Sequence, residues 1–370
     1  MHIALDCRSI HRHMGGIGRA ACELVRHLGA APGGHRITAL RGADAPQDFP
    51  ASGVEFLQVQ AGMVDEHFEQ LGLPGVLQEI GADLYVNTTF SIPAIKTTRY
   101  QVAVIHDVVF EDNPEWVEPS LRGYLQRWSR FAAAHADQVI TVSDHARSRI
   151  CEVYGLAASK VSRIYNGIGE TAFIAPSMEE VANVRRKYGL ENAFLLYIGT
   201  REPKKGIAEL LRAFAHVVSG GFAGSLVLAG AGGDPRLDSK AAAIASGVSE
   251  RTRILGYVTD EEKRALFGGC ALFVYPSRYE GFGLPPLEAL ALGKPCVVSN
   301  ATSIPEIVGD AALITDVTDT IQFAAALTKG LQDTDYRLRA KEAGPKRAKE
   351  FTWPRAATEF IRVFESLESR

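Results

Sequence analysis

The stretch YEGFGLPPLEALALGKPCVVS, residues 279–299, decides the fold of this chain. It follows the apolar run Leu272–Tyr275 and contains a glycine-rich loop, EGFG, then two prolines, an apolar helical pattern and the apolar run Cys296–Ser299. Proline suits the first turn of a helix because no amide proton is needed there. The succession of strand, glycine loop, helix and strand predicts a βαβ unit with parallel strands.

The same alternation of apolar runs and helical patterns extends through all 370 residues. Buried apolar strands separated by amphipathic helices predict α/β domains with parallel sheets covered on both faces. The helical patterns include 17–28, 207–218 and 286–292. The predicted strands, besides the two quoted above, are 3–7, 37–40, 54–59, 84–86, 102–105, 139–142, 161–164, 194–198, 226–229 and 253–255.

The chain length exceeds what one hydrophobic core usually serves, so we expect two domains. The best break is NGIGETAFIAPS, beginning at Asn166, because it holds glycine, proline and small polar residues between two strand–helix patterns. We predict a first doubly wound domain over 1–172 and a second over 173–351, facing each other across a cleft. The amphipathic tail of about 352–370 is expected to pack back on the first domain.

Composition excludes several protein classes. Lys plus Arg number 40 against 43 Asp plus Glu, so the net charge of -3 argues against a nucleic-acid partner. No apolar stretch approaches the roughly 18 residues of a membrane span. The start, MHIALDC, does not resemble a secretion signal, and the five cysteines are scattered without a CxxC pair. These features predict a cytoplasmic protein with reduced thiols.

Two acids bracket the glycine loop of the opening stretch. Glu280 precedes Gly281 and Gly283, and Glu288 follows eight positions later, where we place the first helical turn. The amides at the start of a helix bind anions, and glycine lets a ligand approach the backbone. Carboxylates accept hydrogen bonds from hydroxyls, so two of them around a phosphate site suit a nucleotide sugar.

A pair of lysines, Lys204 and Lys205, follows the predicted strand 194–198 in the sequence YIGTREPKKG. Cations at the carboxyl edge of a sheet can neutralise a diphosphate leaving group, as a metal ion does in other enzymes. Considered alone, the pair is equally compatible with a solvated basic turn.

The opening stretch resembles the E-x7-E motif of retaining glycosyltransferases of family four, which have the two-domain GT-B fold. The resemblance implies that Glu280 contacts hydroxyls of the donor sugar and that Glu288 binds the ribose. It assigns the distal phosphate and the sugar to the loop amides. These amides belong to Gly281, Phe282, Gly283 and Leu284.

The lysine segment is similar to the family element GTxEPRKN, whose Arg-Lys pair binds the pyrophosphate. Lys205 matches the family lysine, whereas Lys204 replaces the arginine and Gly206 replaces the asparagine. Lysine keeps the charge but lacks the bidentate fork of arginine, so Arg201 is a candidate to compensate. The segment ILGYV resembles the one whose backbone contacts the nucleobase, which nominates Tyr257 and Val258.

The first domain carries two further candidates. MGGIGR resembles the GGIGRY loop of the family, which nominates Gly16, and less firmly Gly15, for the donor diphosphate. VIHD resembles the family strand end whose histidine reaches the donor sugar, which nominates His106 and, more loosely, Asp107. The glycines also satisfy GxGxxA, a dinucleotide fingerprint that is weak by itself. His106 could equally be a structural histidine capped by its neighbour.

Three patterns carry less weight. His11 and His13 form HxH without an evident third metal ligand, and Asp333-Thr334-Asp335 spells DxD where a helix cap or surface turn is expected. The helix predicted over 120–135 has an apolar face flanked by arginines. Such a helix packs on its own sheet in most proteins, but it could also contact an anionic membrane.

The resemblance therefore implies a metal-independent retaining glycosyltransferase without a cofactor, similar to bacterial mannosyltransferases of surface polysaccharide synthesis. The resemblance implies a hexose donor, GDP-mannose in the first instance, and a glycan or lipid-linked acceptor. Peripheral contact with the inner face of the membrane is one option. The alternatives are another GT-B enzyme, such as a sugar-nucleotide epimerase or phosphorylase, and a non-catalytic sugar-nucleotide-binding partner.

Overall fold

The computed structural model describes residues 1–11, 15–31, 33–46, 51–234 and 237–369. The described chain divides into two compact units. Unit 1 comprises Met1–Gly167 together with Phe351–Arg370, and unit 2 comprises Ile168–Glu350. The divisions fall after Gly167 and Glu350, whereas the sequence pattern predicted them after 172 and 351. The backbone of Gly167 lies against Trp353, since a Cβ on Gly167 would stand 2.2 Å from the Trp353 amide nitrogen.

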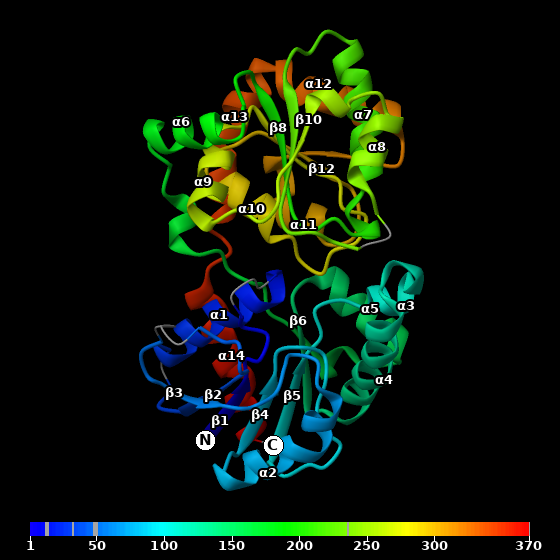
Figure 1. Cartoon of the computed structure of the whole chain (residues 1–370). Helices are drawn as coiled ribbons and strands as arrows, with labels where there is room; N and C mark the ends of the chain where they lie inside the picture. The colour runs from blue at the N-terminus through cyan, green and yellow to red at the C-terminus, as the bar shows by residue number, and fades with distance from the viewer. Residues whose placement is uncertain (12–14, 32, 47–50, 235–236, 370) are drawn as a thin grey trace. The chain divides into compact units, whose positions relative to one another are not determined.

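Unit 1 is a parallel sheet covered by helices (Figure 1). Its strands are β1 (His2–Asp6), β2 (Arg36–Arg41), β3 (Val54–Gln58), β4 (Leu84–Asn87), β5 (Tyr100–Val104), β6 (Gln138–Thr141) and β7 (Val161–Arg163). Its helices are α1 (Gly16–Gly29), the π-helical turn η1 (Phe68–Gly72), α2 (Leu73–Glu79), α3 (Val109–Asp112), α4 (Pro119–His135), α5 (Asp144–Tyr154) and α14 (Trp353–Glu368).

The strand order of unit 1 is that of a doubly wound sheet. In the described residues the order is β3-β2-β1-β4-β5-β6-β7, and every pairing is parallel. The direction of winding reverses between β1 and β4. Ligands of such sheets bind beyond the carboxyl ends of the strands at this switch point.

Helix α14 completes the core of unit 1, although it follows unit 2 in the sequence. Figure 1 shows α14, in red, beside α1 and β1, in blue. Phe364 is fully buried, and Ile361 and Trp353 are nearly so, in one apolar cluster with Leu24 and Ile3. Proline at the second position and the apolar spacing along one face explain why this segment forms an amphipathic helix.

Unit 2 repeats the architecture. Its strands are β8 (Phe194–Ile198), β9 (Ser225–Ala229), β10 (Thr252–Ile254), β11 (Leu272–Tyr275), β12 (Cys296–Ser299) and β13 (Leu313–Thr315). Its helices are α6 (Met178–Lys187), α7 (Ile207–Ser219), α8 (Ser239–Ala245), α9 (Asp260–Gly269), α10 (Leu284–Ala291), α11 (Ile304–Val308), α12 (Thr320–Gln332) and α13 (Thr334–Ala348).

The described strands of unit 2 lie in the order β10-β9-β8-β11-β12-β13, again with parallel pairings. The switch point is therefore between β8 and β11. The prediction of two doubly wound α/β domains is confirmed. Strands β8, β11 and β12 have the predicted bounds, and they are entirely buried, which is why their sequences are continuous apolar runs.

Candidate active site

The loops that follow β8 and β11 lie against each other at the switch point of unit 2. The Arg278 amide donates to the carbonyl oxygen of Lys204 at 2.7 Å. Gly206 has φ +66°, and a Cβ there would stand 2.1 Å from the carbonyl oxygen of Pro276. Asparagine, the usual family residue at this position, tolerates the positive φ but not this contact. Glycine at 206 therefore allows the two loops to approach.

A buried ion pair joins these loops. The Lys205 Nζ lies 2.6 Å from Glu280 Oε1, and the Tyr275 hydroxyl donates to the same oxygen at 2.8 Å. Lys205 and Glu280 are 8% and 9% exposed. The three side chains come from the turn after β8, the loop after β11 and the last residue of β11. Two of the predicted catalytic residues are thus in direct contact.

Both members of the pair are charged near neutral pH. Burial alone would lower the pKa of Lys205, but the neighbouring Glu280 carboxylate outweighs it and raises this pKa. Burial alone would raise the pKa of Glu280, but the charge of Lys205, with help from Lys204, lowers it. Lys205 therefore offers a fixed positive charge, and Glu280 offers a carboxylate that can only accept hydrogen bonds.

The EGFG loop leads directly into α10. Gly283 has φ +111° and precedes the first helical residue, Leu284, and a Cβ on it would meet Ile304 at 2.7 Å. The Ser303 hydroxyl donates to the carbonyl oxygens of Glu280 and Phe282, both at 2.9 Å. No side chain caps the N-terminus of α10. Pro285 and Pro286 have no amide hydrogen, so the amides that this helix start can offer an anion are those of Gly283, Leu284 and Leu287.

Glu288 lies deeper in α10 than the sequence pattern indicated. The helix begins at Leu284, so Glu288 is its fifth residue and belongs to the second turn, not the first. Its Oε1 lies 2.7 Å from Lys263 Nζ on α9, in a pair whose side chains are 20% and 17% exposed. Lys263 holds the carboxylate that the resemblance assigns to the ribose.

The other candidates of unit 2 lie at neighbouring strand ends. Lys204 is 4.0 Å from Glu202 and half-buried. The Arg201 guanidinium donates to the carbonyl oxygen of Gly230, after β9, at 3.0 Å. It is therefore directed to that loop and not to the Lys205–Glu280 pair.

The nucleobase candidates follow β10 at the edge of the same sheet. Tyr257 is 48% exposed, whereas Val258 is 7% exposed. The Gly230 amide donates to the carbonyl oxygen of Gly256 at 3.1 Å, which joins the loops after β9 and β10. The exposed side of Tyr257 is the part of this segment that a flat ligand can reach.

In unit 1, His106 follows β5 and is held by the loop after β4. Its Nε2 lies 2.8 Å from the carbonyl oxygen of Thr88. Burial lowers the pKa of His106, so the imidazole is neutral near pH 7. Asp107 accepts a hydrogen bond from the Val109 amide at 3.1 Å and so stabilises the start of α3.

The glycine loop of unit 1 opens α1. Gly15 is the N-cap and Gly16 the first helical residue, and neither has a positive φ. A Cβ on either glycine would meet no described atom within 4 Å. Packing among the described residues therefore does not require glycine at these two positions. A ligand that approaches the backbone closely would require it.

The patterns given less weight are placed as follows. Asp333 accepts a hydrogen bond from the Tyr336 amide as the N-cap of α13, so the prediction of a helix cap is confirmed. His13 lies outside the described residues. Among the described residues there is no group of three or more side chains suited to hold a metal ion.

Helix α4 packs its apolar face inward, as predicted for a helix on its own sheet. Tyr124 is 8% exposed and Ala132 is fully buried. Two of its exposed arginines pair with acids of unit 1, Arg127 with Glu66 and Arg130 with Glu111. In the described part of the chain, no helix is both long and apolar enough to cross a membrane.

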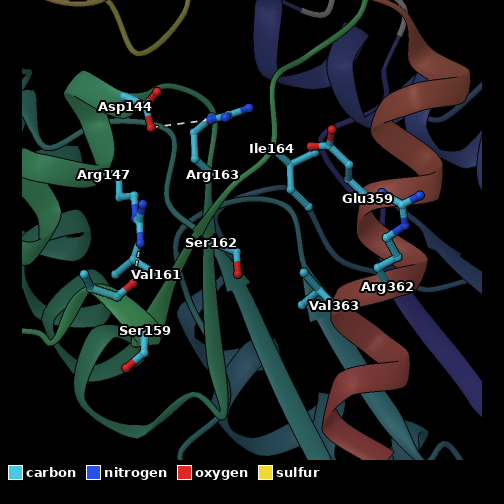
Figure 2. A pocket seen from close by; sticks show the side chains of 11 residues that line it. Asp144, Arg147, Ser159, Val161, Ser162, Arg163, Ile164, Glu359, Arg362 and Val363 are labelled. Carbon is cyan, nitrogen blue, oxygen red and sulfur yellow. Dashed lines mark hydrogen bonds and ion pairs between the residues drawn. The ribbon is translucent and has the colours of Figure 1, made fainter.

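A polar cavity of about 430 Å³ lies at the edge of unit 1, away from these candidates. Arg147 of α5, Arg163 of β7 and Arg362 of α14 line it, and Figure 2 shows Arg147 and Arg362 on opposite sides. Arg163 pairs with Asp144 at 3.5 Å. None of the predicted site residues lines this cavity.

Sequence patterns missed Tyr275 and Lys263, which contact the two predicted glutamates. Tyr275 ends an apolar strand, where an aromatic residue indicates only burial. Lys263 lies in an ordinary charged helix. The signal that could have nominated Tyr275 is a hydroxyl at the carboxyl end of a strand that flanks the switch point.

Two family models together match most of the chain. The model described as Glycosyltransferase Family 4 matches residues 14–170, and the model described as Glycosyl transferases group 1 matches residues 181–347. These ranges cover the glycine loop of unit 1 and all the candidates of unit 2.

One similar protein has the same extent as this chain, and another is much longer. The chain is 31% identical over 385 aligned positions to the O-antigen chain mannosyltransferase B of Escherichia coli, covering 99% of this chain and 100% of that protein. It is 30% identical to the serotype-specific mannosyltransferase WbdA of the same organism, over 75% of this chain and 35% of that protein.

Solved structures share the fold at lower identity. Anabaena HepE in complex with UDP and glucose has a TM-score of 0.79 at 19% identity, covering 99% of this chain and 100% of that chain. WaaG, a glycosyltransferase involved in lipopolysaccharide biosynthesis, has a TM-score of 0.77 at 18% identity, with 97% and 99% covered. The chain therefore belongs to family four of the glycosyltransferases and has the GT-B fold.

Proposed function

We propose that this chain is a retaining, metal-independent mannosyltransferase that moves mannose from GDP-mannose to a glycan or lipid-linked acceptor in surface polysaccharide synthesis. The observation that carries the proposal is the Lys205–Glu280–Tyr275 cluster next to the N-terminus of α10, which no side chain caps. The choice of mannose is supported by the names of the relatives, which are mannosyltransferases.

The donor diphosphate would lie between the two lysines and the first amides of α10. The fixed charge of Lys205 and the positive end of the helix dipole both stabilise negative charge that develops on the leaving group. This electrostatic work is what a divalent cation does in other transferases. We therefore propose that transfer needs no metal ion.

Glu280 would accept hydrogen bonds from hydroxyls of the donor sugar. One of its oxygens already accepts from Lys205 and Tyr275, and the carboxylate is buried. Such a stabilised carboxylate is a weak nucleophile, which favours attack by the acceptor on the face that the diphosphate leaves. The departing phosphate would take the acceptor proton, and the anomeric configuration would be retained.

The family resemblance assigns the neutral imidazole of His106 to the donor sugar and Glu288 to the ribose. Gly15 and Gly16 open α1 to the diphosphate, and Tyr257 with Val258 would contact the base. We further propose that the enzyme acts at the cytoplasmic face of the inner membrane, with α4 as the element nearest to the lipid. In this arrangement a lipid phosphate would replace the carboxylate of Glu66 at Arg127, or that of Glu111 at Arg130.

The first experiment is a thermal-shift screen of the purified protein against nucleotide sugars in EDTA. A ligand that binds only the native state at 100 times its Kd stabilises it by about 2.7 kcal/mol. GDP-mannose is expected to raise Tm more than UDP-glucose, UDP-galactose or ADP-glucose does. A larger shift with another donor would replace the proposed one.

The second experiment is a transfer assay with GDP-mannose and mannose-terminated acceptors, followed by NMR of the product. An α-linked product is expected, because the α donor configuration would be retained. A β-linked product would overturn the retaining mechanism. Loss of transfer in EDTA with recovery in Mn²⁺ would overturn metal independence.

A further inference from the structure

A buried charged network occupies the switch point of unit 1. The Arg8 guanidinium, just after β1, donates to both oxygens of Asp6 at 2.8–3.1 Å and to Glu69 Oε1 at 2.9 Å. These three side chains are 1–2% exposed. Two acids share one arginine, so the network depends on further hydrogen bonds to the second acid.

Glu69 receives those bonds from two other elements. Its Oε2 accepts from the Ser91 hydroxyl at 3.0 Å, in the loop after β4, and from the Tyr124 hydroxyl of α4. Glu69 itself belongs to η1. One carboxylate therefore connects the segment after β1, the loop after β4, a π-helical turn and α4.

The segment Asn87–Ser91, from the end of β4 into the loop that follows it, is strained. Phe90 has φ +77°, a conformation that costs a residue with a side chain about 1–2 kcal/mol. Asn87 donates to Ser91 Oγ at 3.3 Å, and Thr88 donates to the Asp6 carbonyl oxygen at 2.7 Å. Strain of this kind persists where surrounding contacts impose it, and it is concentrated at functional sites.

The strained loop sets the state of His106. A carbonyl oxygen can only accept, so the contact of Thr88 O with His106 Nε2 places the imidazole proton on Nε2 and leaves a lone pair on Nδ1. The Phe90 ring packs edge-on against the imidazole, with 5.5 Å between centroids. The tautomer and the orientation of His106 thus both come from this loop.

We propose that Glu69 is a positioning residue that, through Ser91 and the strained loop Asn87–Ser91, fixes His106 as the Nε2-protonated tautomer with Nδ1 ready to accept a hydroxyl hydrogen bond. The proposal deepens the proposed function and rests on it for the role of His106. It also makes α4 part of the machinery, because the Tyr124 hydroxyl supports Glu69. A network that served only stability would hold the loop without influencing the imidazole.

The test uses the full-length protein labelled with ¹⁵N-histidine and the variants Tyr124→Phe and Ser91→Ala. Each removes one hydroxyl from Glu69 and leaves the Arg8 pairs in place. Thr141→Val in β6 is the matched control, because it removes a fully buried hydroxyl outside the network. NMR of the imidazole nitrogens distinguishes the two neutral tautomers, and the His106→Gln spectrum assigns the signal among the ten histidines.

Wild type and Thr141→Val are expected to show His106 as the Nε2-protonated tautomer without any ligand. Tyr124→Phe and Ser91→Ala are expected to show both tautomers in exchange. Unchanged His106 nitrogen shifts in both variants would overturn the proposal, whether or not the protein transfers mannose. The tautomer measurement can therefore reject this proposal without rejecting the proposed function.

Transfer kinetics provide the second readout. Loss of positioning by a fraction of an ångström lowers kcat on the order of 10-fold to 100-fold, with a smaller change in the donor KM. Tyr124→Phe is expected to show this pattern, and Thr141→Val to keep wild-type kcat. The alternative is that kcat/KM falls only in proportion to the fraction of folded protein, while kcat per folded molecule equals that of wild type. That result would indicate a purely structural network and would overturn the proposal.

Discussion

Lys205 and Glu280 stabilise each other where water is largely excluded, and this makes each dependent on the other. Removing one partner of a buried pair leaves an uncompensated charge and costs about 3–5 kcal/mol. Lys205→Met and Glu280→Gln are therefore expected to lose transfer activity, and Lys205→Met to lose stability of that order. The double variant is expected to be more stable than the sum of the single effects indicates.

Urea unfolding of wild type, both single variants and the double variant forms the required double-mutant cycle. Additive losses of unfolding free energy would contradict a stabilising contact between the two side chains. Retention of full transfer activity in the single variants would contradict their assignment to the site.

Lys263 has a comparable influence on Glu288, in a more exposed setting. Lys263 Nζ lies 2.7 Å from the Glu288 carboxylate. On the proposed function, this ion pair would orient the carboxylate before the nucleotide binds. Lys263→Met is expected to raise the Kd for GDP about 3-fold to 10-fold, as measured by calorimetry, since an ion pair that water can reach contributes up to about 1 kcal/mol.

The matched control for Lys263 is Lys187→Met. Lys187, the last residue of α6, pairs with Glu262 on α9, and its side chain is 59% exposed. The pair does not include Glu288. This variant should bind GDP with wild-type affinity. Equal effects of the two substitutions would indicate a general change in α9 and not an oriented carboxylate.

At the scale of elements, the approach of the loops after β8 and β11 depends on Gly206. Alanine there would have both an unfavourable φ and a Cβ 2.1 Å from the Pro276 carbonyl oxygen. Gly206→Ala is expected to lower the free energy of unfolding by more than 2 kcal/mol and to weaken donor binding, because the loops that carry Lys205 and Glu280 must separate.

A substitution at Gly247 separates the cost of the unfavourable φ from the cost of the contact with Pro276. Gly247 has φ +70°, but a Cβ there would meet nothing within 4 Å. Gly247→Ala is therefore expected to lose only about 1 kcal/mol, the cost of the backbone conformation, with unchanged donor affinity. Equal losses in the two variants, measured by urea unfolding, would show that contact with Pro276 does not matter.

The sequence predicted most strands because a buried parallel strand is a continuous apolar run. It did not predict β13, which is three residues long, lies at the sheet edge and has Ile314 41% exposed. The start of α10 was also placed too late, because Leu284 ahead of the prolines is already helical.

Candidate site residues could be nominated from the sequence where they lie in a loop that follows a strand and match a motif, as Lys205, Glu280 and His106 do. Their partners could not be, because Tyr275, Lys263 and Thr88 are brought to them by strand order and helix packing. The network around Glu69 joins positions 8, 69, 91 and 124, which no local spacing connects. Its residues required coordinates.

For the whole molecule, the tryptophans report on one unit alone. The chain has three, Trp116, Trp128 and Trp353, and all belong to unit 1. Tryptophan fluorescence therefore follows unfolding of unit 1, whereas circular dichroism follows both units. Two transitions that differ between the probes would reveal independent unfolding.

These probes test the contribution of α14. Phe364→Ala removes a fully buried ring from the unit 1 core and is expected to cost about 3–5 kcal/mol, seen as an earlier fluorescence transition. Ile321→Ala on α12, where the side chain is 64% exposed, should leave that transition unchanged. An unshifted transition in Phe364→Ala would show that α14 adds little to unit 1.

Because α14 is encoded after unit 2, the ribosome makes the first sheet long before the helix that covers its apolar surface. About 180 residues, Ile168–Glu350, are synthesised before Phe364 can pack against Leu24, Ile3 and their neighbours. Until then the nascent first unit exposes an apolar surface that chaperones would bind. Productive folding of this enzyme is thus a late event in translation, and polypeptides released early would be natural substrates for proteolysis.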